Sequence, residues 1–181
     1  MAHFSERIQL SPHVEYAPRT GYLWVPMPDI PAPETLLVDG VSFERKPPGS
    51  LHCSVLNAAR LARTSGCTQG YIVDIVDGML QHADLEVDGY TGDFFRCVHP
   101  DSGVQSLVGA ASLRGWGPVA EELRSLVSED LPDPFPHVTT HTSGAPFGVA
   151  IPDMVAFRER CRPLPDEVAH QLHVATKGGG A

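Results

Sequence analysis

The sequence predicts an α+β domain, and three observations support that fold class. The chain has 181 residues and 42% of them are hydrophobic, which suits one compact globular body, as one domain or as two similar lobes. Short β-branched and aromatic runs alternate with stretches in which apolar residues recur at helical spacing. Two of the strand-like runs, 51–56 and 136–140, share the pattern His-x-(Ser/Thr).

The ends of the chain differ in character from its middle. Residues 1–20 are polar and contain two prolines, so we expect a loose N-terminal arm. Residues 177–181 are rich in glycine, and we expect a flexible tail there. A single domain is therefore expected over 21–176.

The elements of this domain are read from turn residues and apolar periodicity. A strand is expected at 21–25, ending at Pro26, and Asp39-Gly40 predicts a hairpin turn between two short strands. After the His-x-Ser strand we expect a helix from Asn57, a helix capped by Thr68 and ending near Leu80, strands over 84–99 and 104–113, a helix with Pro118 at its first position, the His-x-Thr strand, a strand over 147–151 and a helix from Pro152 to Cys161. The periodicity of 165–175 is ambiguous.

Charge and cysteine content exclude several classes of protein. The net charge is −9, which argues against a large non-specific nucleic-acid surface but allows a small anionic ligand. No apolar stretch approaches the length of about 20 residues that a membrane span needs, and the N-terminus lacks the apolar core of a signal peptide. The four cysteines are scattered without a CxxC pair, so we expect four free thiols and a cytoplasmic location.

The two His-x-(Ser/Thr) segments carry the sharpest chemical signal. Side chains at i and i+2 of a strand point to the same face, roughly 6.6 Å apart. His52 therefore projects with Ser54, and His137 with Thr139. If the two strands lie side by side, two imidazoles and two hydroxyls face one cleft. Such a pair of imidazoles can run acid–base chemistry near neutral pH, and the hydroxyls can donate to a phosphate oxygen.

A second interpretation of the His137-Val138-Thr139 motif involves His141. It shares the expected strand face with His137 and Thr139, but we favour His137 because the apolar Val138 can anchor the opposite face in a core. We place His141 near the rim, in solvent or against substrate. His137 and His141 have a spacing that chelates zinc on a helix. On a strand they are about 13 Å apart, too far for a shared ion with Zn–N bonds of about 2 Å, so no metal site is assigned.

Five other residues have both a functional and a structural interpretation. Tyr22 and Trp24 can stack on a base or pack in the core, and Arg96 can bind a phosphate or lie on the surface. Lys46 is either a cation that gates the site or a solvated loop charge. Cys53 alternates away from His52, so we expect a buried thiol.

The segments His52-Cys53-Ser54-Val55 and His137-Val138-Thr139-Thr140 resemble the paired His-hydrophobic-(Thr/Ser)-hydrophobic tetrads of the 2H phosphoesterase superfamily. That superfamily includes the bacterial 2′-5′ RNA ligase-like proteins and the cyclic phosphodiesterases. Thr140 departs from the pattern, and the resemblance covers residues 21–160. It implies a two-lobed, pseudo-symmetric α+β fold in which antiparallel sheets line a central cleft and the helices lie outside.

The resemblance also implies a function. It points to metal-independent chemistry, without a cofactor, on a cyclic or 2′-5′ phosphodiester of a small nucleotide or RNA terminus. His52 and His137 would be the acid–base pair, and Ser54 and Thr139 would bind the phosphate. The acidic charge favours a short substrate over a long nucleic acid. Two alternatives stay open: a nucleotide- or RNA-end-binding module without turnover, and a metal-dependent hydrolase.

Overall fold

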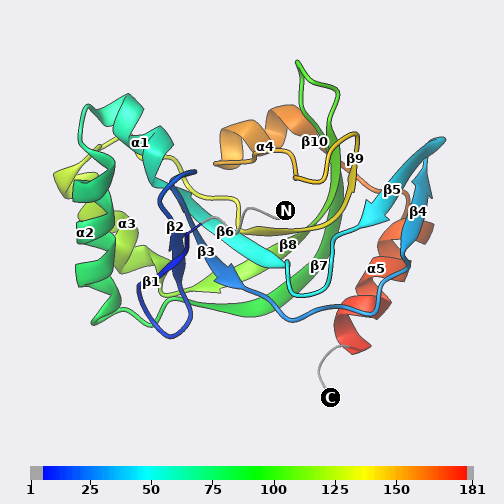
Figure 1. Ribbon diagram of the computed structural model, residues 1–181, viewed down its shortest axis with the longest axis horizontal. Helices are drawn as coiled ribbons and strands as arrows, with labels where there is room; N and C mark the ends of the chain where they lie inside the picture. The colour runs from blue at the N-terminus through cyan, green and yellow to red at the C-terminus, as the bar shows by residue number, and fades with distance from the viewer. Residues whose placement is uncertain (1–5, 179–181) are drawn as a thin grey trace.

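The computed structural model describes residues 6–178 and shows a mixed α+β structure (Figure 1). Within this range ten strands form an open sheet in the order β1-β2-β3-β6-β9-β8-β7-β10, and the β4–β5 hairpin joins β9 through β5. Every pairing is antiparallel, so the α+β class and the antiparallel sheet are confirmed. The strands are β1 (Ile8–Gln9), β2 (Glu15–Ala17), β3 (Tyr22–Pro26), β4 (Thr35–Val38), β5 (Val41–Arg45), β6 (His52–Asn57), β7 (Glu86–Val98), β8 (Gln105–Arg114), β9 (His137–Ser143) and β10 (Cys161–Pro163).

Five helices accompany the sheet within residues 6–178. They are α1 (Ala58–Ser65), α2 (Gln69–Leu80), α3 (Trp116–Leu126), α4 (Met154–Arg160) and α5 (Asp166–Gly178). Figure 1 shows α1, α2 and α3 together at one end, α4 over the middle and α5 toward the other end. The motif strands β6 and β9 pair with each other in the middle of the sheet.

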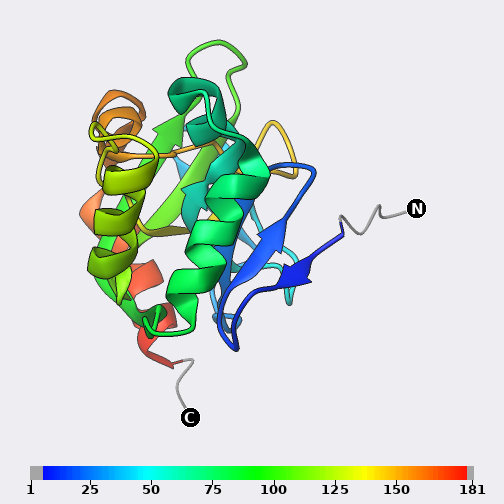
Figure 2. The same cartoon turned by 90° about the vertical axis from the view of Figure 1, so that its left-hand side faces the viewer.

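Helix α2 is built as the sequence predicts. Thr68 caps α2 by accepting a hydrogen bond from the Tyr71 N–H at 3.1 Å. Ile72 and Val76 of α2 are buried in the main core. Figure 2 shows α2 and α3 side by side in front of the sheet. None of the helices within residues 6–178 is long and apolar enough to cross a membrane.

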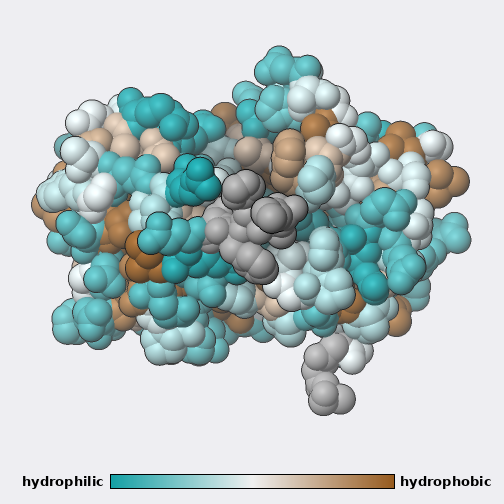
Figure 3. All heavy atoms as spheres, viewed as in Figure 1, coloured by the Kyte–Doolittle hydropathy of each residue, from teal (hydrophilic) through white to brown (hydrophobic). Residues whose placement is uncertain are grey.

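A second, smaller hydrophobic cluster lies under the segment that follows β9. Three of its members flank β9 in the sequence: Phe135 precedes this strand, and Val149 and Ile151 follow it. On the face shown in Figure 3, hydrophobic residues form small patches between hydrophilic ones. The second cluster is completed by Cys97, Val104, Val108, Ala110 and Cys161.

The turn expected at Asp39-Gly40 is confirmed. Val38 pairs with Val41, and the two turn residues have φ angles of 48° and 78°. Both angles lie in the left-handed region that a two-residue hairpin turn of this type requires, which is why glycine stands there.

The expectation of a loose arm over residues 1–20 is wrong for its described part. β1 pairs with β2 and β2 pairs with β3, so residues 8–17 form the edge of the sheet. Val14 and Ala17 are fully buried. These strands are hard to predict from the sequence, because a short edge strand needs only two or three inward-facing apolar side chains among its polar residues and prolines. Residues 1–5 lie outside the described range.

Three further segments differ from expectation. Residues 147–151 are not a strand but an irregular segment between Pro146 and Pro152. Pro118 is the third residue of α3, which begins at Trp116 after Gly115. The ambiguous stretch 165–175 belongs to α5, which continues through Lys177 and Gly178, so the expected tail is helical as far as it is described.

The expectation of four free thiols is also wrong. Cys97 and Cys161 stand directly opposite each other on β7 and β10 and form a disulfide. Cys53 and Cys67 are free, and Cys53 is buried as expected. The bridge escaped sequence reasoning because its two cysteines are 64 residues apart.

Candidate active site

The pairing of β6 with β9 brings the two motifs together. Ser54 lies opposite His137, and Cys53 lies opposite Val138. Extending this antiparallel register by one residue puts His52 opposite Thr139. Because side chains alternate along each strand, all four motif side chains share one face. Directly opposite residues have Cβ atoms about 5 Å apart and diagonal ones about 7–8 Å, so the two imidazoles are close diagonal neighbours.

These four side chains line one cleft of about 320 Å³. Tyr22 and Trp24 of β3, for which the sequence left stacking on a base and core packing open, also line it. The remaining lining residues are Thr20, Lys46, Phe147, Gly148, Val149, Ala150 and Ile151.

The ring of His52 is held from two sides. Its Nδ1 lies 3.0 Å from the carbonyl oxygen of Ser50. Since a carbonyl can only accept, Nδ1 carries the proton and donates, which leaves Nε2 without one in the neutral ring. The Trp24 ring packs against the imidazole with centroids 4.4 Å apart, and the indole Nε1–H donates to Glu15 at 3.0 Å.

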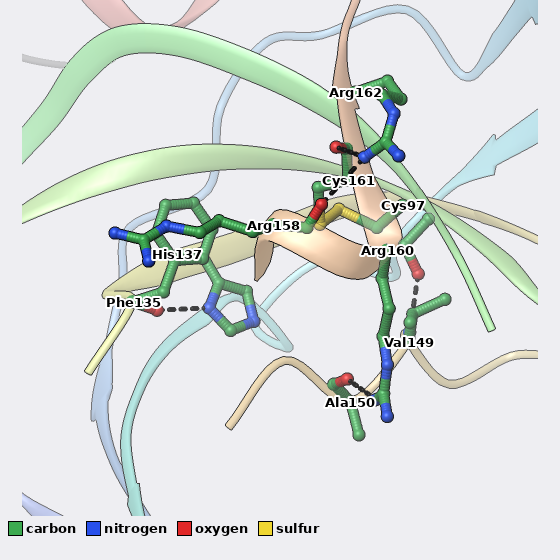
Figure 4. The surroundings of a disulfide bond; sticks show 10 residues. Cys97, Phe135, His137, Val149, Ala150, Arg158, Arg160, Cys161 and Arg162 are labelled. Carbon is green, nitrogen blue, oxygen red and sulfur yellow. Dashed lines mark hydrogen bonds between the residues drawn. A yellow bond between two sulfur atoms is a disulfide. The ribbon is translucent and has the colours of Figure 1, made fainter. Parts of the chain in front are cut away.

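His137 is held by the same kind of bond but is more deeply buried. Its Nδ1 donates to the carbonyl of Phe135 at 2.6 Å, as Figure 4 shows, and the Phe135 ring stacks on the imidazole at 5.3 Å. Only 5% of His137 is exposed, whereas His52 is half-buried. The Nδ1 bond again leaves Nε2 as the ring nitrogen free to meet a ligand.

The segment 147–151 forms one wall of the cleft. The Val149 N–H donates to the buried Ser106 hydroxyl at 2.7 Å, which fixes this segment to β8. At Gly148 the backbone passes so close to β9 that an added Cβ would lie 2.7 Å from Thr139 Oγ1. A glycine is needed here because any side chain would displace the hydroxyl expected to bind phosphate.

Lys46 is the charged residue of the cleft. Among the described lining residues it alone carries a permanent charge, and its Nζ donates to the Pro146 carbonyl at 2.9 Å. Burial lowers the pKa of Lys46 from its ordinary value. The cleft of this acidic protein therefore has a cation and no carboxylate in its described lining, which favours an anionic ligand.

Both motif histidines are biased toward the neutral form. Burial lowers the pKa of His137 to about 4, although the bond to the Phe135 carbonyl opposes this, and the charge of His52 lowers it further. Burial also lowers the pKa of His52, assisted by Lys46 and Arg7 and opposed by the Ser50 carbonyl and Glu15. The influence of one ring on the other is consistent with their position as diagonal neighbours.

Two residues singled out in the sequence lie elsewhere. His141 is fully buried and not at the rim: Nε2 donates to the Pro33 carbonyl at 2.8 Å, and Nδ1 lies 3.0 Å from Thr140 Oγ1. Arg96 donates to Gln105 and pairs with Asp39 at 2.9 Å. Neither residue is part of the cleft lining, so neither is positioned as a substrate contact.

Sequence reasoning missed the wall 147–151 and the role of Phe135. An apolar run beside Gly148 was the available signal for a close backbone approach. His141 does not join His137 in a ligand set, and residues 6–178 contain no group of three or more His, Cys, Asp or Glu side chains placed to hold a metal ion.

Comparison of this chain with protein-family models, curated proteins and solved structures finds no match.

Proposed function

We propose that this protein is a metal-independent phosphodiesterase of the 2H type, which hydrolyses or reversibly forms a cyclic or 2′-5′ phosphodiester in a small nucleotide or RNA terminus. The observation that carries the proposal is the β6–β9 register, which gathers His52, Ser54, His137 and Thr139 on one face of one cleft. In this proposal the antiparallel sheet and its helices form the two-lobed body implied by the tetrads.

The unequal burial of the two rings assigns their roles within the proposal. Of two interacting histidines that share one proton, the less buried ring holds it more readily, and that ring is His52. His137 Nε2 then takes the proton from the attacking water. The new P–O bond forms as the bond to the leaving ribose oxygen breaks, and His52 Nε2–H gives its proton to that oxygen.

The hydroxyls and Lys46 complete the chemistry. Ser54 and Thr139 donate to the non-bridging phosphate oxygens, on which negative charge grows in the transition state. Lys46 lies at the same cleft and, by leaving the Pro146 carbonyl, can pair with the phosphate. The reverse reaction exchanges the roles of the two histidines.

The test is turnover of a panel of 2′,3′-cyclic nucleotides and short 2′-5′ linked oligonucleotides with a chelator present. We expect product formation by the wild-type protein and a loss of about 1,000-fold or more in both His52→Gln and His137→Gln, since each general acid or base contributes 10²–10⁴-fold. His82→Gln, on the surface, is the matched control and should keep full activity.

Two outcomes would replace the proposal. Binding of these ligands without turnover by the wild-type protein would favour the binding module. Turnover abolished by the chelator and restored by zinc would favour the metal-dependent hydrolase. The cytoplasmic location expected from the sequence requires the Cys97–Cys161 bridge to form in the cytoplasm, whereas disulfides persist mainly in oxidising compartments.

A further inference from the structure

A second cavity of about 290 Å³ lies beside the histidine cleft. It is enclosed by the end of β6, α1, the first residue of α3, the connection 128–134 and the two residues before α4. Its volume is close to the lower end of the range for small-molecule pockets, about 300–1,000 Å³.

The two cavities are joined by a small hollow along β6. Three residues of this hollow, Tyr22, Ser54 and Ile151, also line the histidine cleft. Four others, Val55, Leu56, Asn57 and Pro152, also line the second cavity. The groove thus begins at a proposed phosphate-binding hydroxyl and continues about 10 Å along the strand to Asn57.

The walls of the second cavity combine apolar side chains with polar and charged ones. Leu61, Leu131 and Trp116 line it, together with Pro132, Pro134 and Pro152. The indole Nε1 of Trp116 is buried and has no hydrogen-bond partner, which is rare in folded proteins because each such donor costs free energy. An acceptor on a bound ligand would satisfy that donor.

The charges of the cavity do not favour a second phosphate. Arg60 is already paired with the buried Asp153 at 3.3 Å, and Asp130 adds a further negative charge to the lining. A neutral, planar group with hydrogen-bond acceptors fits a cavity that offers apolar side chains, the ring of Trp116 and an unpaired N–H donor. A nucleobase is such a group.

We propose that the second cavity binds the base of the neighbouring nucleoside, so that the preferred ligand is a dinucleotide or longer end and not a mononucleotide. This inference rests on the proposed function, because the phosphate in the histidine cleft sets where the next nucleoside falls. The second cavity is then a specificity site of the same groove, in which Trp116 donates a hydrogen bond to the base and the prolines pack against the base.

The experiment is equilibrium binding, which needs no turnover. Two ligands are titrated into the full chain: adenosine 3′-monophosphate, and the dinucleotide ApAp. ApAp carries the same 3′-phosphate and one more nucleoside, which is joined through a phosphodiester. We expect the dinucleotide to bind about 10-fold more tightly. Trp116→Phe, which removes only the N–H donor, and Thr64→Trp, which adds bulk at the rim of the cavity, should each reduce this advantage to below 3-fold. The mononucleotide affinity should stay unchanged.

A matched control uses the residue before Thr64. Arg63→Trp places the same bulk on the same exposed turn of α1 outside the cavity lining, and it should keep the dinucleotide advantage. Equal affinities for the two ligands in the wild-type protein, or an advantage that survives both cavity variants, would overturn the inference. Absence of turnover with a retained dinucleotide advantage would instead refute the proposed catalysis and leave the subsite established.

Discussion

The Nδ1 atoms of His52 and His137 each lie within hydrogen-bonding distance of the carbonyl two residues earlier, 3.0 Å to Ser50 and 2.6 Å to Phe135. The carbonyl fixes the tautomer, and the strand fixes the direction in which the ring projects. Burial then sets the protonation, most strongly at His137, whose pKa it lowers to about 4.

The lowered pKa of His137 predicts a dependence of stability on pH. Below pH 6.5 the unfolded chain takes up a proton on this residue, but the folded protein does not until about pH 4. The free energy of unfolding should therefore fall as the pH drops from 6.5 to 4, by roughly 3 kcal/mol from this group. Urea unfolding of the wild-type protein and His137→Gln at pH 7 and pH 4.5 measures the difference.

The variant isolates the contribution because other groups titrate equally in both proteins. We expect His137→Gln to lose less stability than the wild-type protein on acidification, while His82→Gln behaves as the wild-type protein does. Parallel pH dependence in wild type and His137→Gln would show that the folded protein accepts the proton on His137 without cost.

The sequence predicts the grouping of these residues but not their environment. Alternation along a strand is a local property, so His52 with Ser54 and His137 with Thr139 follow from spacing alone. The burial of His137 under Phe135 depends on segments far apart in the chain. His141 was misplaced for the same reason, since its partner Pro33 lies on a distant loop.

At the level of elements, the wall over the cleft depends on one close approach. The segment 144–152 follows β9 and returns across Thr139, with Gly148 at the point of contact. The apolar run at 147–151 resembles a strand in sequence. Its Val149 N–H donates to a serine hydroxyl instead of a strand carbonyl, and prolines at both ends prevent a regular ladder.

Gly148→Ala should therefore impair the cleft selectively. The added Cβ would lie 2.7 Å from Thr139 Oγ1, so either the hydroxyl or the wall must move. We expect phosphate binding and turnover to fall by about 10-fold, corresponding to the loss of about one hydrogen bond. Steady-state kinetics on a cyclic nucleotide and titration with phosphate measure both effects.

Gly70→Ala is the control for this substitution. Gly70 lies in α2, and an added Cβ there meets nothing within 4 Å, so activity should be unchanged and stability slightly raised by the better helix former. An active Gly148→Ala protein with unaltered phosphate affinity would mean that Thr139 does not contact the phosphate.

For the whole molecule, one open sheet joins the helices and the Cys97–Cys161 bridge ties its far edge. The fold class was predictable because apolar periodicity and turn residues are local signals. The course of the sheet was not, since β6 and β9 come together from distant parts of the chain. The disulfide and the N-terminal edge strands were missed for the same physical reason.

Reduction of this bridge should destabilise the protein measurably. A loop of 64 residues corresponds to about 4 kcal/mol of lost unfolded-state entropy, which for a domain of this size is a fall in Tm of about 10 °C. Thermal unfolding with and without a reductant tests this. The Cys97→Ser/Cys161→Ser double variant should have the Tm of the reduced protein, and its Tm should not change when the reductant is added.

The remaining cysteines supply the control. Cys67→Ser leaves the bridge intact, so its Tm should still respond to the reductant as that of the wild-type protein does. An identical Tm for the wild-type protein under both conditions would mean that the bridge makes no contribution to stability in solution.

Long-range ¹H–¹⁵N spectra of histidine-labelled protein, recorded during a phosphate titration, test most directly whether His52 and His137 act on one ligand. Signals are assigned with the two His→Gln variants. We predict that in the absence of phosphate both rings are neutral at pH 7.5 with the proton on Nδ1, and that phosphate shifts both Nε2 signals with a single Kd while the His82 signals do not move. A neutral ring with its proton on Nε2 and none on Nδ1, or a shift confined to one of the two histidines, would contradict the account.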